Sequence, residues 1–380
     1  MSTKQRVVAF SLVATLLGGL VLFTGDTPTV AAPKAVGVDK LLKNVQTGNP
    51  KFKTIGRLSF GPSGVLLVAD PGSASIVAID TGDTGPLNKL KKRIDNVDQL
   101  LAKSIGATKV KITDLAVNQL SGTIYLATTR NDAILTIDGD GKVGTLDMAK
   151  LRYVRVTLPS DGKAKVSNIT DVSFADDRVL ASGQSGRQFS SKIYSLPLPL
   201  EHGASADIYS AETYHVAHRR WETRAPIQSF IPYTEDGKDY IVGSFACTPI
   251  AKFPIGDLKS GAKVKGTSII ELGSGNRPLD MFSYEKDGKT WIVTNTLRFH
   301  KNLFGPSKYW GVRIESSYLT AKKTNEDSAR RDTKTKSGPK GVEIVDALFG
   351  AVQVDKLSNT EMVVLREEKG QLNLELAPLP

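Results

Sequence analysis

Short runs of β-branched and aliphatic residues, separated by turn-forming residues, make up most of the chain after residue 54. The first group shows the pattern: residues 55–60, 65–70 and 75–80 are largely apolar, and a Gly-Pro-Ser-Gly sequence separates the first two runs. Short apolar runs bounded by Gly, Pro, Ser or Asp are typical of antiparallel strands. This stretch therefore predicts a meander of three strands.

The same unit recurs along the chain. Alignment of the units places one polar residue at an equivalent position in each: Arg57, Asp114, Asp171, Ser229, Asp280 and Gln353. Successive members of this polar column are 57, 57, 58, 51 and 73 residues apart. A near-constant period that carries three or four strands is typical of a β-propeller, in which each blade buries its faces against its neighbours.

Six units are visible, so the sequence predicts an all-β protein folded as a six-bladed β-propeller. A seventh blade could lie within residues 146–167 or 320–344. Residues 95–104 have helical spacing and predict a short helical insertion. Four Asp-Gly-Lys tripeptides would supply tight turns between antiparallel strands; they begin at Asp140, Asp161, Asp236 and Asp287.

The two ends of the chain predict an exported protein with a closed ring. Lys4 and Arg6 precede an apolar run from Val7 to Phe23, so residues 1–32 resemble a signal peptide, with an uncleaved N-terminal anchor as the alternative. We expect a periplasmic or extracellular protein that is soluble or tethered by this segment. Residues 33–53 form a lead-in that could supply a ring-closing strand, because the propeller predicted over 54–380 ends after a third strand.

Charge and cysteine content narrow the range of partners. The net charge is +11, and part of the excess lies in a basic tract at 320–340 that we expect to be a disordered loop. A basic exported protein is attracted to acidic polymers, acidic ligands or envelope proteins, whereas nucleic acid is not expected there. We expect a monomer, with membrane contact only through an uncleaved leader. Cys247 is the single cysteine, so no internal disulfide can form.

The phrase Phe60-Gly-Pro-Ser-Gly-Val-Leu-Leu-Val-Ala-Asp resembles the repeat phrase of six-bladed propellers of the TolB-like group. This group includes NHL-repeat and gluconolactonase-type proteins, and the resemblance extends over residues 50–380. It implies a six-bladed ring with a binding site at the mouth of the central channel. Gluconolactonase-type enzymes hold their metal with an early Glu as well as Asn and Asp, and no matching early Glu is present.

The polar column is the first candidate site. Because the innermost strands of a propeller line its channel, Asp114, Asp171 and Asp280 could converge on a cation such as Ca²⁺. A ligand at the channel mouth could then contact four further side chains, namely Arg57, Ser229, Arg277 and Gln353. In the alternative interpretation, these Asp residues cap turns or accept hydrogen bonds from backbone amides of the adjoining blade.

The histidines form a second, weaker candidate. His215 and His218 make a His-x-x-His sequence, and His300 or Cys247 could complete a transition-metal site. The same tract is also consistent with an exposed amphipathic connector.

Three functional hypotheses follow. The first is an exported propeller that binds a ligand or an envelope protein without catalysis. The second is a metal-assisted hydrolase or lyase whose cation is held over the channel by the Asp residues of the polar column. The third is a metal-dependent redox accessory that uses the His and Cys set. No paired nucleophile and base occurs at a recognisable spacing, which favours a binding protein. Enzymatic activity stays open, because the active sites of propellers are assembled from residues of different blades.

Overall fold

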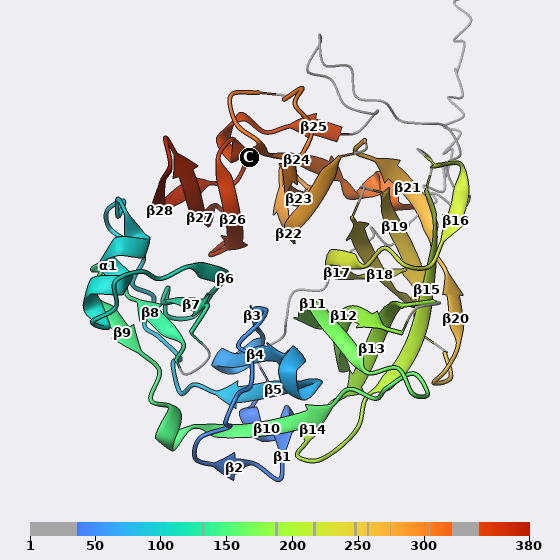
Figure 1. The fold of residues 1–380 in the computed structure, drawn as a ribbon, viewed down its shortest axis with the longest axis horizontal. Helices are drawn as coiled ribbons and strands as arrows, with labels where there is room; N and C mark the ends of the chain where they lie inside the picture. The colour runs from blue at the N-terminus through green and yellow to red at the C-terminus, as the bar shows by residue number, and fades with distance from the viewer. Residues whose placement is uncertain are drawn as a thin grey trace, which may run out of the picture.

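The computed structural model describes residues 36–320 and 342–380, apart from 131–132, 187–188, 216–217, 247–248, 257, 274 and 304. In this part of the chain, six sheets of three or more strands stand in a ring around a central axis (Figure 1). The predicted six-bladed β-propeller is therefore confirmed. Three predicted features lie outside the described residues: the leader, Cys247 and the basic tract at 321–340.

Each blade begins with its innermost strand. Blade 1 contains β3 (Leu58–Phe60), β4 (Val65–Asp70), β5 (Ser75–Asp80), β10 (Arg152–Thr157) and β2 (Gln46–Thr47); blade 2 contains β6 (Ile112–Val117), β7 (Ile124–Thr128), β8 (Leu135–Ile137) and β9 (Val143–Thr145). Blade 3 contains β11 (Val166–Phe174), β12 (Arg178–Ser185), β13 (Ser191–Pro197), β15 (Asp207–His215), β16 (Arg220–Glu222) and β20 (Lys263–Lys265).

The other three blades have simpler outer edges. Blade 4 contains β17 (Ile227–Glu235), β18 (Lys238–Phe245), β19 (Pro249–Pro254) and β21 (Thr267–Glu271); blade 5 contains β22 (Asn276–Lys286), β23 (Lys289–Arg298), β24 (Tyr309–Glu315) and β25 (Val342–Ile344). Blade 6 contains β26 (Ala351–Lys356), β27 (Glu361–Glu368) and β28 (Gln371–Pro378). Strands β10 and β25 come from the two stretches that could have held a seventh blade, and they complete blades 1 and 5 instead.

In the described part of the chain, helical structure is limited to short segments outside the strands. The predicted insertion forms α1 (Val97–Ser104), and single 3₁₀ turns occur at η1 (Val38–Lys40), η2 (Pro62–Gly64), η3 (Pro71–Ser73), η4 (Met148–Lys150), η6 (Ser316–Thr320) and η7 (Asp346–Leu348). Within the described residues, no helix has both the length and the apolar content needed to cross a membrane. The Asp-Gly turns at Asp236 and Asp287 join β17 to β18 and β22 to β23, with left-handed backbone at both turn residues.

The two faces of each blade pack against different neighbours, as β4 shows. All six of its residues are buried. Because successive side chains of a strand point to opposite faces, Leu66 joins a cluster with Tyr125 of blade 2, whereas Leu67 joins a cluster with Val179 of blade 3. A strand covered on both faces needs the continuous apolar run that this sequence has.

The order of the blades around the ring differs from their order along the chain. Blade 1 packs between blades 2 and 3, and blade 2 packs against blade 6, so the ring runs 2-1-3-4-5-6 (Figure 1). The chain leaves blade 1 to build blade 2 and then returns as β10, which pairs with β5 at the outside of blade 1. Only then does it enter blade 3.

The lead-in does not close the ring, contrary to the prediction. Its described strands, β1 (Leu42–Lys43) and β2, pair with β14 (Leu200–Glu201) and β10. Blade 2 separates blade 1 from blade 6, so these strands lie away from the open edge of β28. That edge is met by the insertion before α1: Ile94 N–H donates to Leu374 O at 2.8 Å, and Leu374 N–H donates to Ile94 O at 2.9 Å.

Candidate functional site: the polar ring and the His-Glu cluster

Bulges on the inner strands turn the polar column toward the axis. In blades 2 to 6 the register of the inner strand shifts by one extra residue immediately before or at the column position. In blade 1, Gly56 N–H donates to Ala69 O, and Ala69 N–H donates to Arg57 O. Gly56 and Arg57 thus both lie opposite Ala69, which is the arrangement of a β-bulge. A bulge bends the strand and redirects the side chain next to it.

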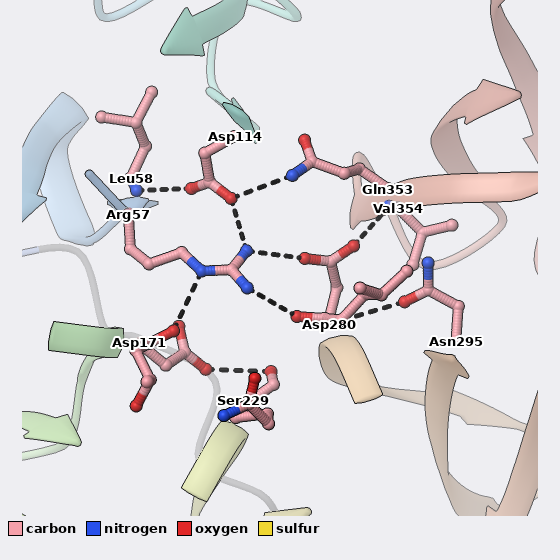
Figure 2. Close-up of polar contacts among 12 residues, drawn as sticks. Arg57, Leu58, Asp114, Asp171, Ser229, Asp280, Asn295, Gln353 and Val354 are labelled. Carbon is pink, nitrogen blue, oxygen red and sulfur yellow. Dashed lines mark hydrogen bonds and ion pairs between the residues drawn. The ribbon is translucent and has the colours of Figure 1, made fainter. Parts of the chain in front are cut away.

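Arg57 lies at the centre of the ring that results (Figure 2). Its Nη1 is 2.6 Å from Asp114 Oδ1 and 3.3 Å from Asp280 Oδ1. Its Nη2 donates to Leu279 O at 3.1 Å, and its Nε donates to Thr170 O at 2.9 Å. One guanidinium therefore joins blade 1 to both of its neighbours, blades 2 and 3, and to blade 5 on the opposite side of the channel.

Three Asp residues of the ring accept backbone amides of an adjoining blade. Asp114 accepts Leu58 N–H at 2.6 Å, and Asp280 accepts Val354 N–H at 3.0 Å (Figure 2). Asp171 accepts the N–H of Phe230 at 2.8 Å. These contacts are the alternative role that the sequence left open for the polar column.

The remaining blade boundaries are also joined by hydrogen bonds near the axis. Asp355, which follows the column position in blade 6, accepts Val117 N–H of blade 2 at 2.7 Å. Arg277 Nε donates to Gln228 Oε1 across the boundary between blades 4 and 5 at 2.9 Å. Together with the contact of Arg57 to Thr170, every boundary in the ring is joined by a polar contact near the axis. Asp355 was missed because it lies two positions after the column.

Burial changes the ionisation of the carboxyl groups around Arg57. Loss of hydration raises the pKa of Asp171 to about 6 and that of Asp280 to about 7, although the charge of Arg57 acts in the opposite direction. Burial likewise raises the pKa of Asp355 to about 7 and that of Asp114 above its usual range. Burial alone would lower the pKa of Arg57, but the carboxyl groups of Asp114 and Asp280 raise it above its usual value. Arg57 therefore stays a cation.

The predicted calcium ligands surround a guanidinium group. Among the described residues, Asp114, Asp171 and Asp280 do not form a group whose oxygen atoms all lie within 4.8 Å of one another. Beside Arg57 is a cavity of about 100 Å³, lined by polar groups that include Ser59, Asp171 and Asp355. Pockets for small organic ligands usually have about 300–1,000 Å³.

The four residues predicted to bind a ligand at the channel mouth have partners inside the protein. Arg57 and Arg277 make the contacts given above. Ser229 Oγ donates to Asp171 Oδ2 at 2.9 Å, and Gln353 Nε2 donates to Thr113 O at 3.0 Å. Binding of a ligand by these residues stays a prediction.

Three side chains at the outer edge of blade 3 form a second cluster. His215 ends β15, His218 lies in the loop that follows, and Glu222 ends β16. Glu222 Oε2 is 3.7 Å from His215 Nδ1 and 3.5 Å from His218 Nδ1. Within the described residues, this is the one group of three or more His, Cys, Asp or Glu side chains with ligand atoms all within 4.8 Å.

The cluster differs from the set predicted from the sequence. His300 lies in an exposed loop after β23, where its Nδ1 accepts the Asn302 N–H at 3.2 Å, and Cys247 is outside the described residues. Glu222 was missed, although its position four residues after His218 was a signal. Burial lowers the pKa of His215, which favours the neutral imidazole.

No family model matches this chain, and no curated protein matches its sequence. Similar solved structures include the GH43 BlXynB protein from Bacillus licheniformis, with 12% identity, a TM-score of 0.36, and coverage of 88% of this chain and 55% of that one. The Bacteroides ovatus Xyloglucan PUL GH43B has 10% identity, a TM-score of 0.34, and coverage of 71% of this chain and 53% of that one. Virginiamycin B lyase from Staphylococcus aureus has 9% identity, a TM-score of 0.26, and coverage of 88% of this chain and 99% of that one. The chain spans about half the length of the first two, and we draw no conclusion about activity from likenesses of this size.

Proposed function

We propose that this protein is an exported binding module of the cell envelope, and that it binds an acidic polymer through the outer edge of blade 3. The observation that carries the proposal is a strip of cationic and aromatic side chains on that edge. The strip consists of Phe189, Arg220, Trp221, Lys263 and Lys265.

The strip pairs each exposed lysine of β20 with an aromatic ring. Lys265 Nζ is 4.7 Å from the centre of the Trp221 ring, and Lys263 Nζ is 4.3 Å from the centre of the Phe189 ring. Trp221 is 39% exposed, so part of its ring is open to solvent. Tyr214 packs edge-on against it at 5.7 Å between ring centres. The aromatic rings thus hold the lysines in place on the surface.

This arrangement suits an extended acidic partner. Lysine and arginine side chains attract carboxylate or phosphate groups, and exposed aromatic rings add contact area that needs little ordering. Two carboxylates lie beside the strip, Glu212 near Lys265 at 3.6 Å and Glu222 near Arg220 at 3.9 Å, so they offset only part of the positive charge. The net charge of +11 adds a long-range attraction in the same direction.

The channel is a weaker candidate for binding. The resemblance to NHL-type propellers supports a binding role, and it would favour the channel mouth. We favour the outer edge because Arg57 is engaged with Asp114 and Asp280 and the cavity beside it is small.

Binding of the full-length chain to a surface coated with poly-L-glutamate tests the proposal. We expect saturable binding that weakens as salt is added, and no binding to neutral dextran. Trp221→Ala and Lys265→Ala should each weaken the binding about ten-fold or more. Lys289→Ala is the matched control, because Lys289 is also exposed over a tryptophan, Trp291, but on blade 5.

Two outcomes would count against the proposal. Equal loss of affinity in Lys289→Ala would indicate an effect of overall charge alone. Loss of binding only on deletion of 322–340 would place the contact in the basic tract, away from blade 3.

Export is tested separately. Expression of the full-length chain with a C-terminal tag should place it in the envelope or extracellular fraction. N-terminal sequencing should then show either removal of the leader near Ala32 or Ala35, or an intact anchor. Recovery of the whole pool from the cytosol would contradict export.

A further inference from the structure

We propose that His215, His218 and Glu222 form a binding site for a divalent transition-metal ion of the Zn²⁺ type. The site lies in the β15–β16 hairpin at the outer edge of blade 3, away from the polar ring. It does not depend on the proposed binding of an acidic polymer, since different side chains would carry the two functions.

The first argument is the environment of His215. Its side chain is 1% exposed, and neither ring nitrogen has a hydrogen-bond partner among the residues that the structure describes. The neighbouring ring of Phe245, 6.3 Å away between ring centres, cannot satisfy these nitrogens. A buried polar group without a partner is costly, and the site of such a group calls for an explanation. A metal ion bound by the imidazole would provide one.

The second argument is the spacing of the possible ligand atoms. In a tetrahedral zinc site with bonds of about 2.0–2.1 Å, two ligand atoms lie about 3.3 Å apart. The distances of 3.7 Å and 3.5 Å from Glu222 Oε2 to the two Nδ1 atoms are close to this value. The two imidazole ring centres are 5.4 Å apart, and about 5 Å is expected when both rings bind one ion. The two rings are stacked with 18° between their planes, so the more exposed imidazole of His218 has to rotate before both rings can point a nitrogen at one ion.

The ligand chemistry selects the class of metal. Two imidazoles and one carboxylate suit Zn²⁺ and similar borderline ions, whereas Ca²⁺ and Mg²⁺ prefer oxygen ligands alone. The same set with a water in the fourth position occurs in catalytic zinc sites. His218 is 41% exposed, so solvent can reach this side of the cluster.

The local fold holds the three side chains in place. Strands β15 and β16 pair as a hairpin, with Thr213 opposite Glu222 and His215 opposite Arg220. Arg219, between His218 and β16, adopts a left-handed backbone conformation with φ of 50°. His218 contacts both other members of the cluster: its ring stacks on that of His215, and its Nδ1 is 3.5 Å from Glu222 Oε2.

Titration of the metal-free full-length chain with Co²⁺ tests the inference, because Co²⁺ bound by nitrogen and oxygen ligands absorbs visible light. We expect one Co²⁺ per chain with the absorption of a four- or five-coordinate ion, and its displacement by Zn²⁺. His218→Ala and Glu222→Gln should each weaken Co²⁺ binding about ten-fold or more. His300→Ala, which removes an exposed imidazole outside the cluster, should leave the titration unchanged.

His215→Ala should have the largest effect, but it also changes a buried position. If that variant does not fold, His218→Ala and Glu222→Gln still decide the question, because both residues are more exposed. The inference is wrong if the wild-type chain gives no visible Co²⁺ absorption. It is also wrong if that absorption is retained in both His218→Ala and Glu222→Gln, or is lost in His300→Ala. The readout does not involve the polymer, so failure of the metal site and failure of the proposed function are distinguishable.

Discussion

Arg57 and Asp114 meet across the boundary between blades 1 and 2, with Nη1 of the arginine 2.6 Å from Oδ1 of the aspartate. The other oxygen of Asp114 accepts the backbone N–H of Leu58, the residue after Arg57. The side chain of one blade thus binds both the side chain and the backbone of the next. Because the guanidinium also reaches Asp280, the ring carries its own cation at the axis.

Removal of that cation should destabilise the whole ring. In Arg57→Ala, three buried carboxyl groups, those of Asp114, Asp171 and Asp280, lose their main source of positive charge. Loss of one partner of a buried ion pair typically costs about 3–5 kcal/mol. Urea denaturation of wild type and variant measures the change. Arg152→Ala is the control, because the side chain of Arg152 is 53% exposed where it pairs with Asp80 and should contribute less than Arg57 does. Equal losses in the two variants would contradict the central role of Arg57.

Stability should fall as the pH rises through the range in which the ring carboxyls ionise. The folded chain holds protons on Asp171, Asp280 and Asp355, whose pKa values are about 6, 7 and 7, whereas the unfolded chain loses them near 3.8. This contribution is complete below about pH 4 and is lost toward about pH 7. Each unit of pKa shift corresponds to about 1.4 kcal/mol.

The midpoint of urea denaturation should therefore be higher at about pH 5 than at about pH 8. Asp355→Asn should flatten this dependence, since the amide has no proton to lose in this range. Asp140→Asn is the control, because Asp140 is exposed and its pKa is lowered, so it does not titrate there. A midpoint that stays level or rises from about pH 5 to about pH 8 would contradict protonated carboxyls in the folded ring, because groups ionised in both states add no pH dependence there.

The seam between blade 6 and the rest of the ring should depend on Ile94. Ile94→Pro removes the N–H that donates to Leu374 O. Strand β28 should then lose protection from hydrogen exchange, and the free energy of unfolding should fall by about 1–3 kcal/mol. Ile94→Ala keeps the backbone bonds and loses only a half-buried side chain, so it serves as the control. Unchanged exchange of the Leu374 amide in Ile94→Pro would show that the seam is held elsewhere.

The period of the sequence was sufficient to predict the ring and the inward-facing column. Apolar runs reveal each blade, and one polar residue per unit marks the inner strand. The order of the blades around the ring was not predictable. The alternation of buried side chains in blade 1 is the same whether blade 1 packs against blade 3 or against blade 6. What decides the order is β10, which pairs with β5 only after blade 2 is complete.

The chemistry of the column was only partly predictable. The pattern placed Asp114 and Asp280 at the axis, but it could not show that Arg57 is long enough to cross the channel and contact both. The His-Glu cluster was missed in part for a related reason. His218 and Glu222 are close in sequence, but the approach of Glu222 to the buried ring of His215 depends on the pairing of β15 with β16.

Calorimetric titration of Ca²⁺ into the full-length wild type and into Arg57→Ala tests most directly whether the guanidinium takes the place of a metal ion. We expect no Ca²⁺ binding to the polar ring of the wild type, and one new site in Arg57→Ala that restores part of the lost stability. Stoichiometric Ca²⁺ binding by the wild type that disappears in Asp114→Asn or Asp280→Asn would contradict this account and would favour a metal-assisted hydrolase or lyase instead.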